Sequence, residues 1–234
     1  MNRFWLLATS LILLTLAAEA QITKGTRLLG GSVGYNQSKN TSTSRNPTFP
    51  ATQPEYEQAN RSFNVSPRVG IFIADNLAAG LSIGYSSQKA TAPYYDYYSS
   101  GNPVTYQRID RSNTLYAAPF LRYYYLPTAT FGVYGQLTAS YGMGKNTSEN
   151  SAPNQSKNEA KNSGFGIGIS PALVFFPIDK LGLELAFGGI GYERNTVKTD
   201  AARNQLEGKT TSSRFGANFG LDQLSLGASY YFGR

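Results

Sequence analysis

The sequence contains no cysteine and no histidine among its 234 residues. Without cysteine the chain has no disulfide, no reactive thiol and no attachment point for a lipoprotein anchor. Without histidine it lacks the base used by most hydrolases, and the absence of both residue types removes the usual ligands of zinc. We therefore expect no enzyme activity, no metal site and no cofactor.

Long apolar runs are equally scarce. The run at residues 4–16 is shorter than the ~20 residues that a membrane-spanning helix needs, and no later segment reaches that length. It follows Arg3 and precedes Ala18-Glu19-Ala20, which has the small-x-small pattern of a cleavage site. The pattern predicts a cleaved signal peptide at 1–20 and one exported domain at 21–234. Only strands could carry that domain across a membrane.

What the sequence does contain is alternation with a period of two, the side-chain period of a β-strand. In the closing segment one face is apolar, namely Leu224, Leu226, Ala228, Tyr230 and Phe232. Seven earlier segments repeat the pattern, so strands are expected at 26–36, 63–73, 77–85, 115–125, 131–143, 165–175, 181–188 and about 214–232. Many glycines (24), many tyrosines (17) and a mean hydropathy of −0.32 fit apolar residues at alternate positions only.

The connections between these segments alternate in length. Short turns at 74–76, 126–128 and 177–180 alternate with long polar stretches at 37–62, 86–113, 145–162 and 193–213. Long loops on one rim, short turns on the other and an even strand number are typical of transmembrane barrels. The sequence therefore predicts an all-β fold: a single closed eight-stranded antiparallel transmembrane up-and-down β-barrel, with both termini on the short-turn side.

Three prolines mark an internal repeat. Pro67, Pro119 and Pro171 are 52 residues apart, each preceded by serine or alanine and each in a strand that leads into a short turn. Proline cannot donate a hydrogen bond to the strand ladder, and a closed barrel has no free edge on which to place it. A bulge or a locally lost hydrogen bond is expected at each proline.

A secreted lipocalin-like barrel would also have eight strands, but with its apolar face inside. Three features favour the membrane alternative, the first being that the long loops lie on one rim only. The polar faces are rich in glycine and serine, which suit a narrow lumen, and tyrosine and phenylalanine gather at strand ends, as in the aromatic girdles of membrane barrels.

Together these features resemble the small outer-membrane β-barrel family of OmpA/OmpX-like architecture. Gly227, Tyr230 and Phe232 resemble the C-terminal assembly signal of such proteins. The resemblance implies a porin-like or structural barrel in the outer membrane of a Gram-negative cell envelope. It also implies the barrel-assembly machinery as a partner during insertion and outer-membrane lipid as the surroundings.

The predicted inward faces carry candidate functional residues. Arg68, Arg122 and Glu184 lie at similar depth, so they form either an interior ion-pair network or three separately hydrated charges. The network is preferred because an unpaired interior charge is costly. Large against small side chains should fill the lumen and block a straight water path, with these residues facing one another: Tyr116, Phe120 and Tyr124 against Gly166, Gly168, Gly182 and Gly188.

The predicted external loops hold two further features. Tyr94, Tyr95, Tyr97 and Tyr98 form either a recognition surface or an extension of the aromatic rim. Basic residues outnumber acidic ones, for example Arg194, Lys198, Arg203 and Lys209, which favours contact with lipopolysaccharide. The charges are scattered and accompany no nucleic-acid-binding motif, so nucleic acid is not an expected partner.

Two functions remain open on this sequence. The first is a structural or surface-interaction barrel with a lumen filled by side chains. The alternative is a small conduit for small solutes or hydrophobic molecules. An eight-stranded outer-membrane acyltransferase would need a histidine, which this chain lacks.

Overall fold

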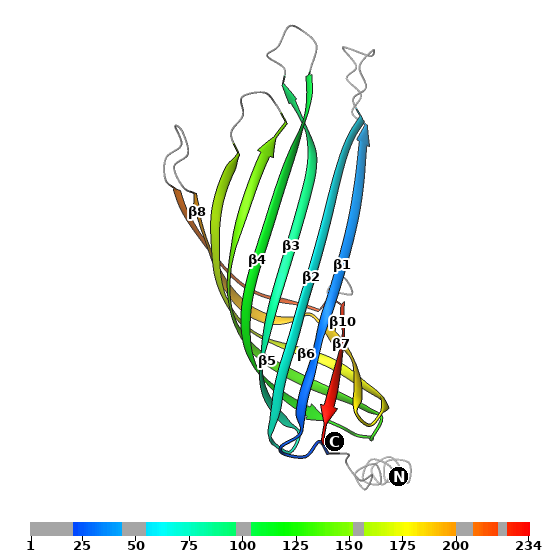
Figure 1. Cartoon of the computed structure of the whole chain (residues 1–234). Helices are drawn as coiled ribbons and strands as arrows, with labels where there is room; N and C mark the ends of the chain where they lie inside the picture. Colours follow the sequence, from blue (N-terminus) through cyan, green and yellow to red (C-terminus); the bar gives the residue numbers. More distant parts are fainter. Residues whose placement is uncertain (1–20, 44–54, 97–103, 152–156, 200–207, 220–223) are drawn as a thin grey trace, which may run out of the picture.

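The computed structural model describes residues 21–43, 55–96, 104–151, 157–199, 208–219 and 224–234. In this part of the chain the only regular elements are ten β-strands (Figure 1): β1 (Arg27–Thr43), β2 (Glu55–Ala74), β3 (Leu77–Asp96), β4 (Val104–Tyr125), β5 (Phe131–Asn150), β6 (Asn158–Ile178), β7 (Leu181–Phe187), β8 (Gly189–Thr199), β9 (Gly208–Asn218) and β10 (Leu224–Phe232). No helix among the described residues is long and apolar enough to cross a membrane.

Eight of the strands close into a ring. Neighbouring strands pair antiparallel in the order β1-β2-β3-β4-β5-β6-β7-β10, and β10 returns to β1 through pairs such as Leu29↔Tyr230. Strands β8 and β9 continue from the upper part of β6 and lie outside this ring. Figure 1 shows the start of β1 and the C-terminus at the end of the barrel where the short turns lie. The predicted closed eight-stranded antiparallel barrel is thus confirmed.

The apolar faces of the strands point outward. On β3, Leu81, Ile83 and Tyr85 are 40%, 51% and 40% exposed, whereas the alternating residues Ala78 and Ser82 are 0% and 9% exposed. A barrel in water would bury its apolar face, so this orientation suits lipid around the wall and excludes the lipocalin-like alternative.

Exposed aromatic side chains gather at two heights on the outer face. An upper girdle crosses β1 to β9 and consists of Tyr35, Phe63, Tyr85, Tyr141, Phe165 and Phe215. A lower girdle near the short turns consists of Tyr123, Tyr125, Phe131, Phe175, Tyr230 and Phe232. Aromatic rings favour the two boundaries between lipid and water, so the wall between the girdles is the membrane-spanning part.

The strands extend well beyond the upper girdle, which corrects the predicted loop lengths. Most of the stretches predicted as loops at 86–113 and 145–162 belong to β3, β4, β5 and β6, which are 20 to 22 residues long. The sequence concealed these extensions because both faces of them are polar. Their backbone groups nevertheless pair across neighbouring strands, as in Lys89↔Arg111 and Lys145↔Lys161.

A bulge follows the predicted strand at 181–188, which corresponds to β7, and the last predicted strand is interrupted. Between the pairs Ile169↔Ile190 and Ala172↔Ala186, β6 advances three residues while its partner advances four. The extra residue forms a bulge beside Gly188, whose φ of 42° is one that glycine adopts without strain. Likewise β9 ends at Asn218 and β10 begins at Leu224, so the predicted single strand from about 214 to 232 was wrong.

Each repeated proline coincides with a gap in one ladder, as predicted. Pro67 pairs with β1 but has no partner on β3, and Pro119 pairs with β3 but has none on β5. Pro171 pairs with β5 and has no partner on β7 or β8. The missing N–H of proline thus weakens the wall on the same side of all three hairpins.

The segment before β1 covers the short-turn end of the barrel. Ile22 is fully buried, its N–H donates to Asn76 Oδ1 at 2.9 Å, and its carbonyl accepts from Asn76 N at 2.9 Å. Asn76 has a φ of 60°, a conformation that asparagine tolerates in tight turns. Arg234 bridges two other turns by donating to the carbonyls of Asp179 and Ala129 at 3.0 and 2.9 Å.

Candidate functional site: the floor of the lumen

The inward faces of the strands place charged side chains at one depth above the short turns. The structure brings together all three of the charged residues expected in the lumen. Arg68 on β2 and Arg122 on β4 both contact Glu184 on β7, at 3.0 and 2.9 Å. Each arginine lies three strands from β7 around the ring, in opposite directions. We call this group and its hydrogen-bonding neighbours the lumen floor.

The carboxylate of Glu184 accepts hydrogen bonds from four side chains. Oε1 accepts from Arg122 Nη1 at 2.9 Å and from Ser229 Oγ, while Oε2 accepts from Arg68 Nη1 at 3.0 Å and from Tyr134 Oη at 2.8 Å. Because Glu184 is only 3% exposed, these donors replace the water that a free carboxylate would bind. With both oxygens occupied, it is poorly placed to act as a base or nucleophile.

Arg122 is fully buried and uses its guanidinium on several sides. Nε and Nη2 donate to Gln136 Oε1 at 3.0 and 2.7 Å, and Nη1 also donates to Tyr124 Oη at 2.8 Å. The ring of Tyr134 stacks on the guanidinium, with Cζ 4.0 Å from the ring centroid. Charge pairing, hydrogen bonds and cation–π contact together offset the cost of burying this cation.

Aromatic side chains close the lumen below the charges. Tyr124 and Tyr231 are both fully buried, and their hydroxyl oxygens lie 2.9 Å apart. Phe72 and Phe176 pack against Tyr231 with ring centroids 6.2 and 5.3 Å away. These rings belong to one buried cluster that also contains Ile22 and Leu28. The floor is therefore a packed layer at the short-turn end.

The sequence had identified the charges but not the side chains that satisfy them. Gln136 on β5 and Ser229 on β10 bond to Arg122 and Glu184 on the directly neighbouring strands β4 and β7, whereas Tyr134 on β5 reaches Glu184 across the lumen. All three sit on inward, alternating positions at the height of the charges. An explicit strand register would have pointed to them, whereas spacing along the chain could not.

Large and small side chains do alternate in the lumen, but on different strands from those expected. A Cβ on Gly80 would lie 2.5 Å from the ring of Phe120, and one on Gly84 would overlap the ring of Tyr116. The aromatic side chains of β4 therefore lie over glycines of the adjacent β3. Of the glycines predicted to face them, Gly182 instead makes room for Tyr231, 2.9 Å from the position of a Cβ.

The lumen above the floor is hollow. A cavity of about 610 Å³ is lined by β5, β6, β8 and β9, including Ser140, Gly168, Gly191 and Gly216. A smaller one of about 160 Å³ lies directly on the floor, beside Arg68, Gln136 and Glu184. The expectation of a lumen filled by side chains thus holds at the short-turn end and not in the upper half.

The wall beside the larger cavity is not closed by hydrogen bonds. β1 pairs with β10 only from Arg27 to Ser32, and above Ser32 the described strands pair β1 with β2 alone. β9 pairs with β8 alone among the described strands. Among the described residues, β1 above Ser32 and β9 thus each have one edge without a pairing strand.

The other predicted residues lie apart from the floor. Tyr94 and Tyr95 belong to the end of β3, where their backbones pair with Tyr106 and Thr105. Tyr97, Tyr98 and Arg203 lie outside the described residues. On β10, Tyr230 and Phe232 point outward with ring centroids 4.7 Å apart, and Gly227 faces the lumen beside Arg68 and Glu184. Their role as an assembly signal stays a prediction.

Within the described residues no group of three or more acidic, histidine or cysteine side chains could hold a metal ion. Most buried polar atoms of the floor satisfy one another, whereas Arg68 Nε has no hydrogen-bond partner in the part of the chain that the structure describes. The chemistry of the floor is structural: it ties opposite walls of the barrel together and blocks the axis.

Comparison with known proteins bears on the fold. No protein-family model and no curated protein matches the sequence. Among solved structures, the outer membrane protein OprG from Pseudomonas aeruginosa aligns with a TM-score of 0.50 at 14% identity, over 91% of this chain and 98% of that one. The fold is that of a small outer-membrane β-barrel. The expected resemblance to that family is thereby confirmed for architecture, although the low identity carries over no function.

Two other solved structures align less well. A major outer membrane protein from Thermus thermophilus has a TM-score of 0.42 at 15% identity, over 91% of this chain and 100% of that one. Ail of Yersinia pestis, in complex with the heparin analogue sucrose octasulfate, has a TM-score of 0.33 at 14% identity, over 90% and 100% of the two chains.

Proposed function

We propose that the chain is an integral outer-membrane β-barrel protein with a structural or surface-interaction role, which passes no solute along its axis. The observation that carries this proposal is the lumen floor. Glu184 binds arginines from opposite walls, and the buried rings of Tyr124 and Tyr231 lie below it. An axial path would have to break these contacts.

The strand extensions supply a surface for such a role. A tilted strand needs about 9–11 residues to cross a bilayer, whereas β2 to β6 have 20 to 22. About half of each strand therefore stands outside the membrane as a rigid, polar sheet. The signal peptide at residues 1–20 and insertion by the barrel-assembly machinery accompany this proposal as predictions.

Planar-bilayer conductance of the refolded protein tests the proposal. The wild-type protein should insert without producing current steps of channel size. Glu184→Gln should produce openings, because it removes the negative charge that holds Arg68 and Arg122 together. Glu149→Gln is the matched control, since it removes an acid from the outer sheet only. Channel-size steps from inserted wild-type protein would refute the proposal.

A second candidate is a conduit for small hydrophobic molecules with a sideways exit. It is favoured by the cavity of about 610 Å³ and by the edge of β9, which lines this cavity and pairs with no described strand other than β8. In this case molecules would enter from the long-strand end and leave into the bilayer, because the floor blocks the axis.

A cavity-filling substitution distinguishes the two candidates. Gly216 lines the cavity, and no atom lies within 4 Å of a Cβ placed there, so Gly216→Phe should fill the space without a clash. Gly208→Phe on the same strand is the control, because that position is equally open and lies outside the cavity lining. A conduit predicts slower uptake of an apolar dye into proteoliposomes for Gly216→Phe alone. Equal uptake by all three proteins excludes the sideways conduit.

A further inference from the structure

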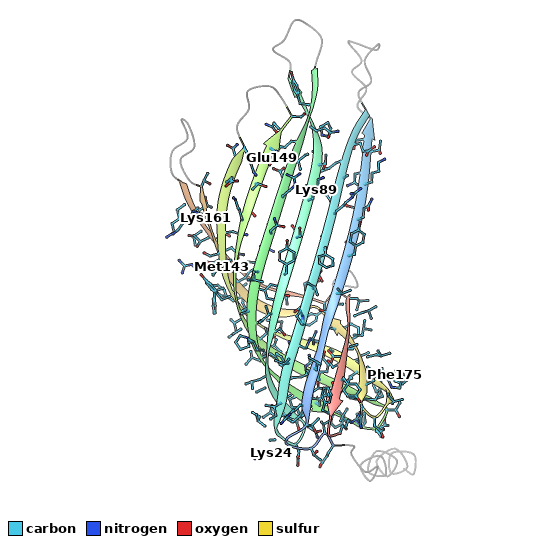
Figure 2. All side chains as sticks on the ribbon, viewed as in Figure 1. Lys24, Lys89, Met143, Glu149, Lys161 and Phe175 are labelled. Atoms are coloured by element: carbon cyan, nitrogen blue, oxygen red, sulfur yellow. The ribbon has the colours of Figure 1, made fainter. Side chains whose placement is uncertain are left out.

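Seven basic side chains form a row on the outer face of the strand extensions. They are Arg61, Lys89, Arg111, Lys145, Lys161, Lys198 and Lys209, here called the basic row. Each occupies an outward position of its strand, and all are exposed except the half-buried Arg111. In Figure 2, Lys89 and Lys161 lie in the half of the barrel away from Lys24.

Strand pairing places these cations directly opposite one another. On β2, β3 and β4 the register pairs Arg61↔Lys89 and Lys89↔Arg111. On β5, β6, β8 and β9 the register runs Lys145↔Lys161, Lys161↔Lys198 and Lys198↔Lys209. Directly opposed side chains have Cβ atoms only about 4.5–5.5 Å apart, so like charges in these positions repel. Folding alone gives no reason for five such pairs.

Carboxylates of the chain neutralise only the middle of the row. Glu149 binds Arg111 at 2.9 Å, and Glu159 binds Lys145 at 2.6 Å. Among the described residues, no carboxylate lies within 4 Å of the charged nitrogens of these four residues: Arg61, Lys89, Lys198 and Lys209. Both ends of the row therefore present positive charge to the surroundings.

The height of the row indicates what those surroundings are. Along its strand, Arg61 is two residues beyond Phe63 of the upper girdle, and Lys89 is four beyond Tyr85. Aromatic girdles mark the boundary of the hydrocarbon layer, so the row stands at the level of lipid head groups. Lysine and arginine at that level have stems that lie along apolar surface and charged ends that reach phosphates.

We propose that the basic row binds the phosphate groups of lipopolysaccharide in the leaflet around the barrel. The row requires a ligand that carries several negative charges, spreads along the wall and lies just outside the hydrocarbon layer. A phosphorylated glycolipid combines these properties, and its phosphates lie between opposed cations and relieve their repulsion. This inference rests on the proposed function, since it needs the barrel to span an outer membrane.

The test uses the full mature chain refolded into phosphatidylcholine nanodiscs with and without lipid A. Insertion is first checked by protection of the spanning strands from protease, so a failure of the membrane assignment is recognised separately. The affinity for lipid A is then measured by titration for the wild type and for the variant Lys198→Gln/Lys209→Gln. Each lysine near an anionic lipid surface contributes about 1 kcal/mol of attraction, so losing two of them should weaken the binding of lipid A by about 30-fold. High salt should weaken wild-type binding as well.

The control and a second measurement separate lipid binding from a structural role. Lys24→Gln/Lys180→Gln removes two exposed lysines from the short-turn end and should bind lipid A like the wild type. Without lipid A, Lys198→Gln/Lys209→Gln should melt at or above the wild-type temperature, because a repulsive pair is gone. Binding of lipid A that is unchanged in this variant, or matched by phosphatidylglycerol, would overturn the inference.

Discussion

Arg122 on β4 and Glu184 on β7 meet across the lumen, with Nη1 2.9 Å from Oε1 and exposures of 0% and 3%. β5 and β6 lie between these strands in the wall, so the contact joins opposite sides of the barrel. Arg68 on β2 reaches the other oxygen of the same carboxylate. One acid thus holds two arginines, and its removal leaves a buried and a partly buried cation together.

The first prediction concerns that acid. Glu184→Gln should destabilise the barrel by about 3–5 kcal/mol, which is the usual cost of removing one partner of a buried ion pair. The change is measured as the midpoint of urea unfolding in detergent. Unfolding is monitored by the heat-modifiable shift in electrophoretic mobility. A midpoint equal to that of the wild type would mean that the three charges are independently hydrated.

Apolar replacement provides the control for this prediction. Arg122→Met/Glu184→Leu still leaves Arg68 without its carboxylate, so it should recover only part of the lost stability. The triple variant that adds Arg68→Met should recover more, because no buried charge remains unpaired. If the triple variant is less stable than Glu184→Gln, packing rather than charge pairing explains the floor.

The second prediction concerns pH and the outer ion pairs. Hydrogen bonds from Arg111 and then Lys157 lower the pKa of Glu149, and those from Lys145 lower the pKa of Glu159. Carboxyl groups with lowered pKa values stabilise the folded state above their ordinary pKa, and this contribution is lost as the pH falls through the lowered values. The extensions of β5 and β6 should therefore loosen as the pH falls below the ordinary pKa of a glutamate carboxyl group.

Hydrogen exchange of the β5–β6 extension tests the pH prediction. Exchange at residues 145–150, corrected for the intrinsic effect of pH, should lose protection between pH 5 and pH 3 in the wild type, because carboxyl groups titrate there. Glu149→Gln/Glu159→Gln should lack this acid step. The same loss of protection in the variant would assign the effect to other groups.

The third prediction concerns the close packing between β3 and β4. Gly80→Ala would place a Cβ 2.5 Å from Phe120 Cζ, so it should destabilise the barrel by about 1–3 kcal/mol through overpacking. Gly135→Ala is the control, because nothing lies within 4 Å of a Cβ at that outward position. Equal unfolding midpoints for the two variants would contradict the packing described here.

The sequence was sufficient to predict the ring of eight strands, the short turns and the two faces of each strand. These follow from local alternation and from turn residues such as Asp75 and Asn76, which act within a few positions along the chain. It was also sufficient to predict the gaps at Pro67, Pro119 and Pro171, since a missing N–H is a property of the residue itself.

What could not be predicted depends on contacts between distant strands. The polar extensions have no apolar face, so nothing in their pattern separates strand from loop. The bulge beside Gly188 depends on how β7 and β8 register against β6. The hydrogen bond from Tyr134 to Glu184 joins strands that are not neighbours, and the one from Ser229 depends on the register between β7 and β10, so no local spacing encodes either.

The central claim is that the wall between the girdles spans the outer membrane, with the short turns inside and the strand extensions outside. Because the chain has no cysteine, a single introduced cysteine is a unique label site. Lys157→Cys, at the start of the β6 extension, and Asp179→Cys, in the turn before β7, are both exposed positions at opposite ends. In intact cells a membrane-impermeant maleimide should label Lys157→Cys at once and Asp179→Cys only after the outer membrane is permeabilised. Labelling of Asp179→Cys in intact cells with Lys157→Cys protected would contradict this orientation.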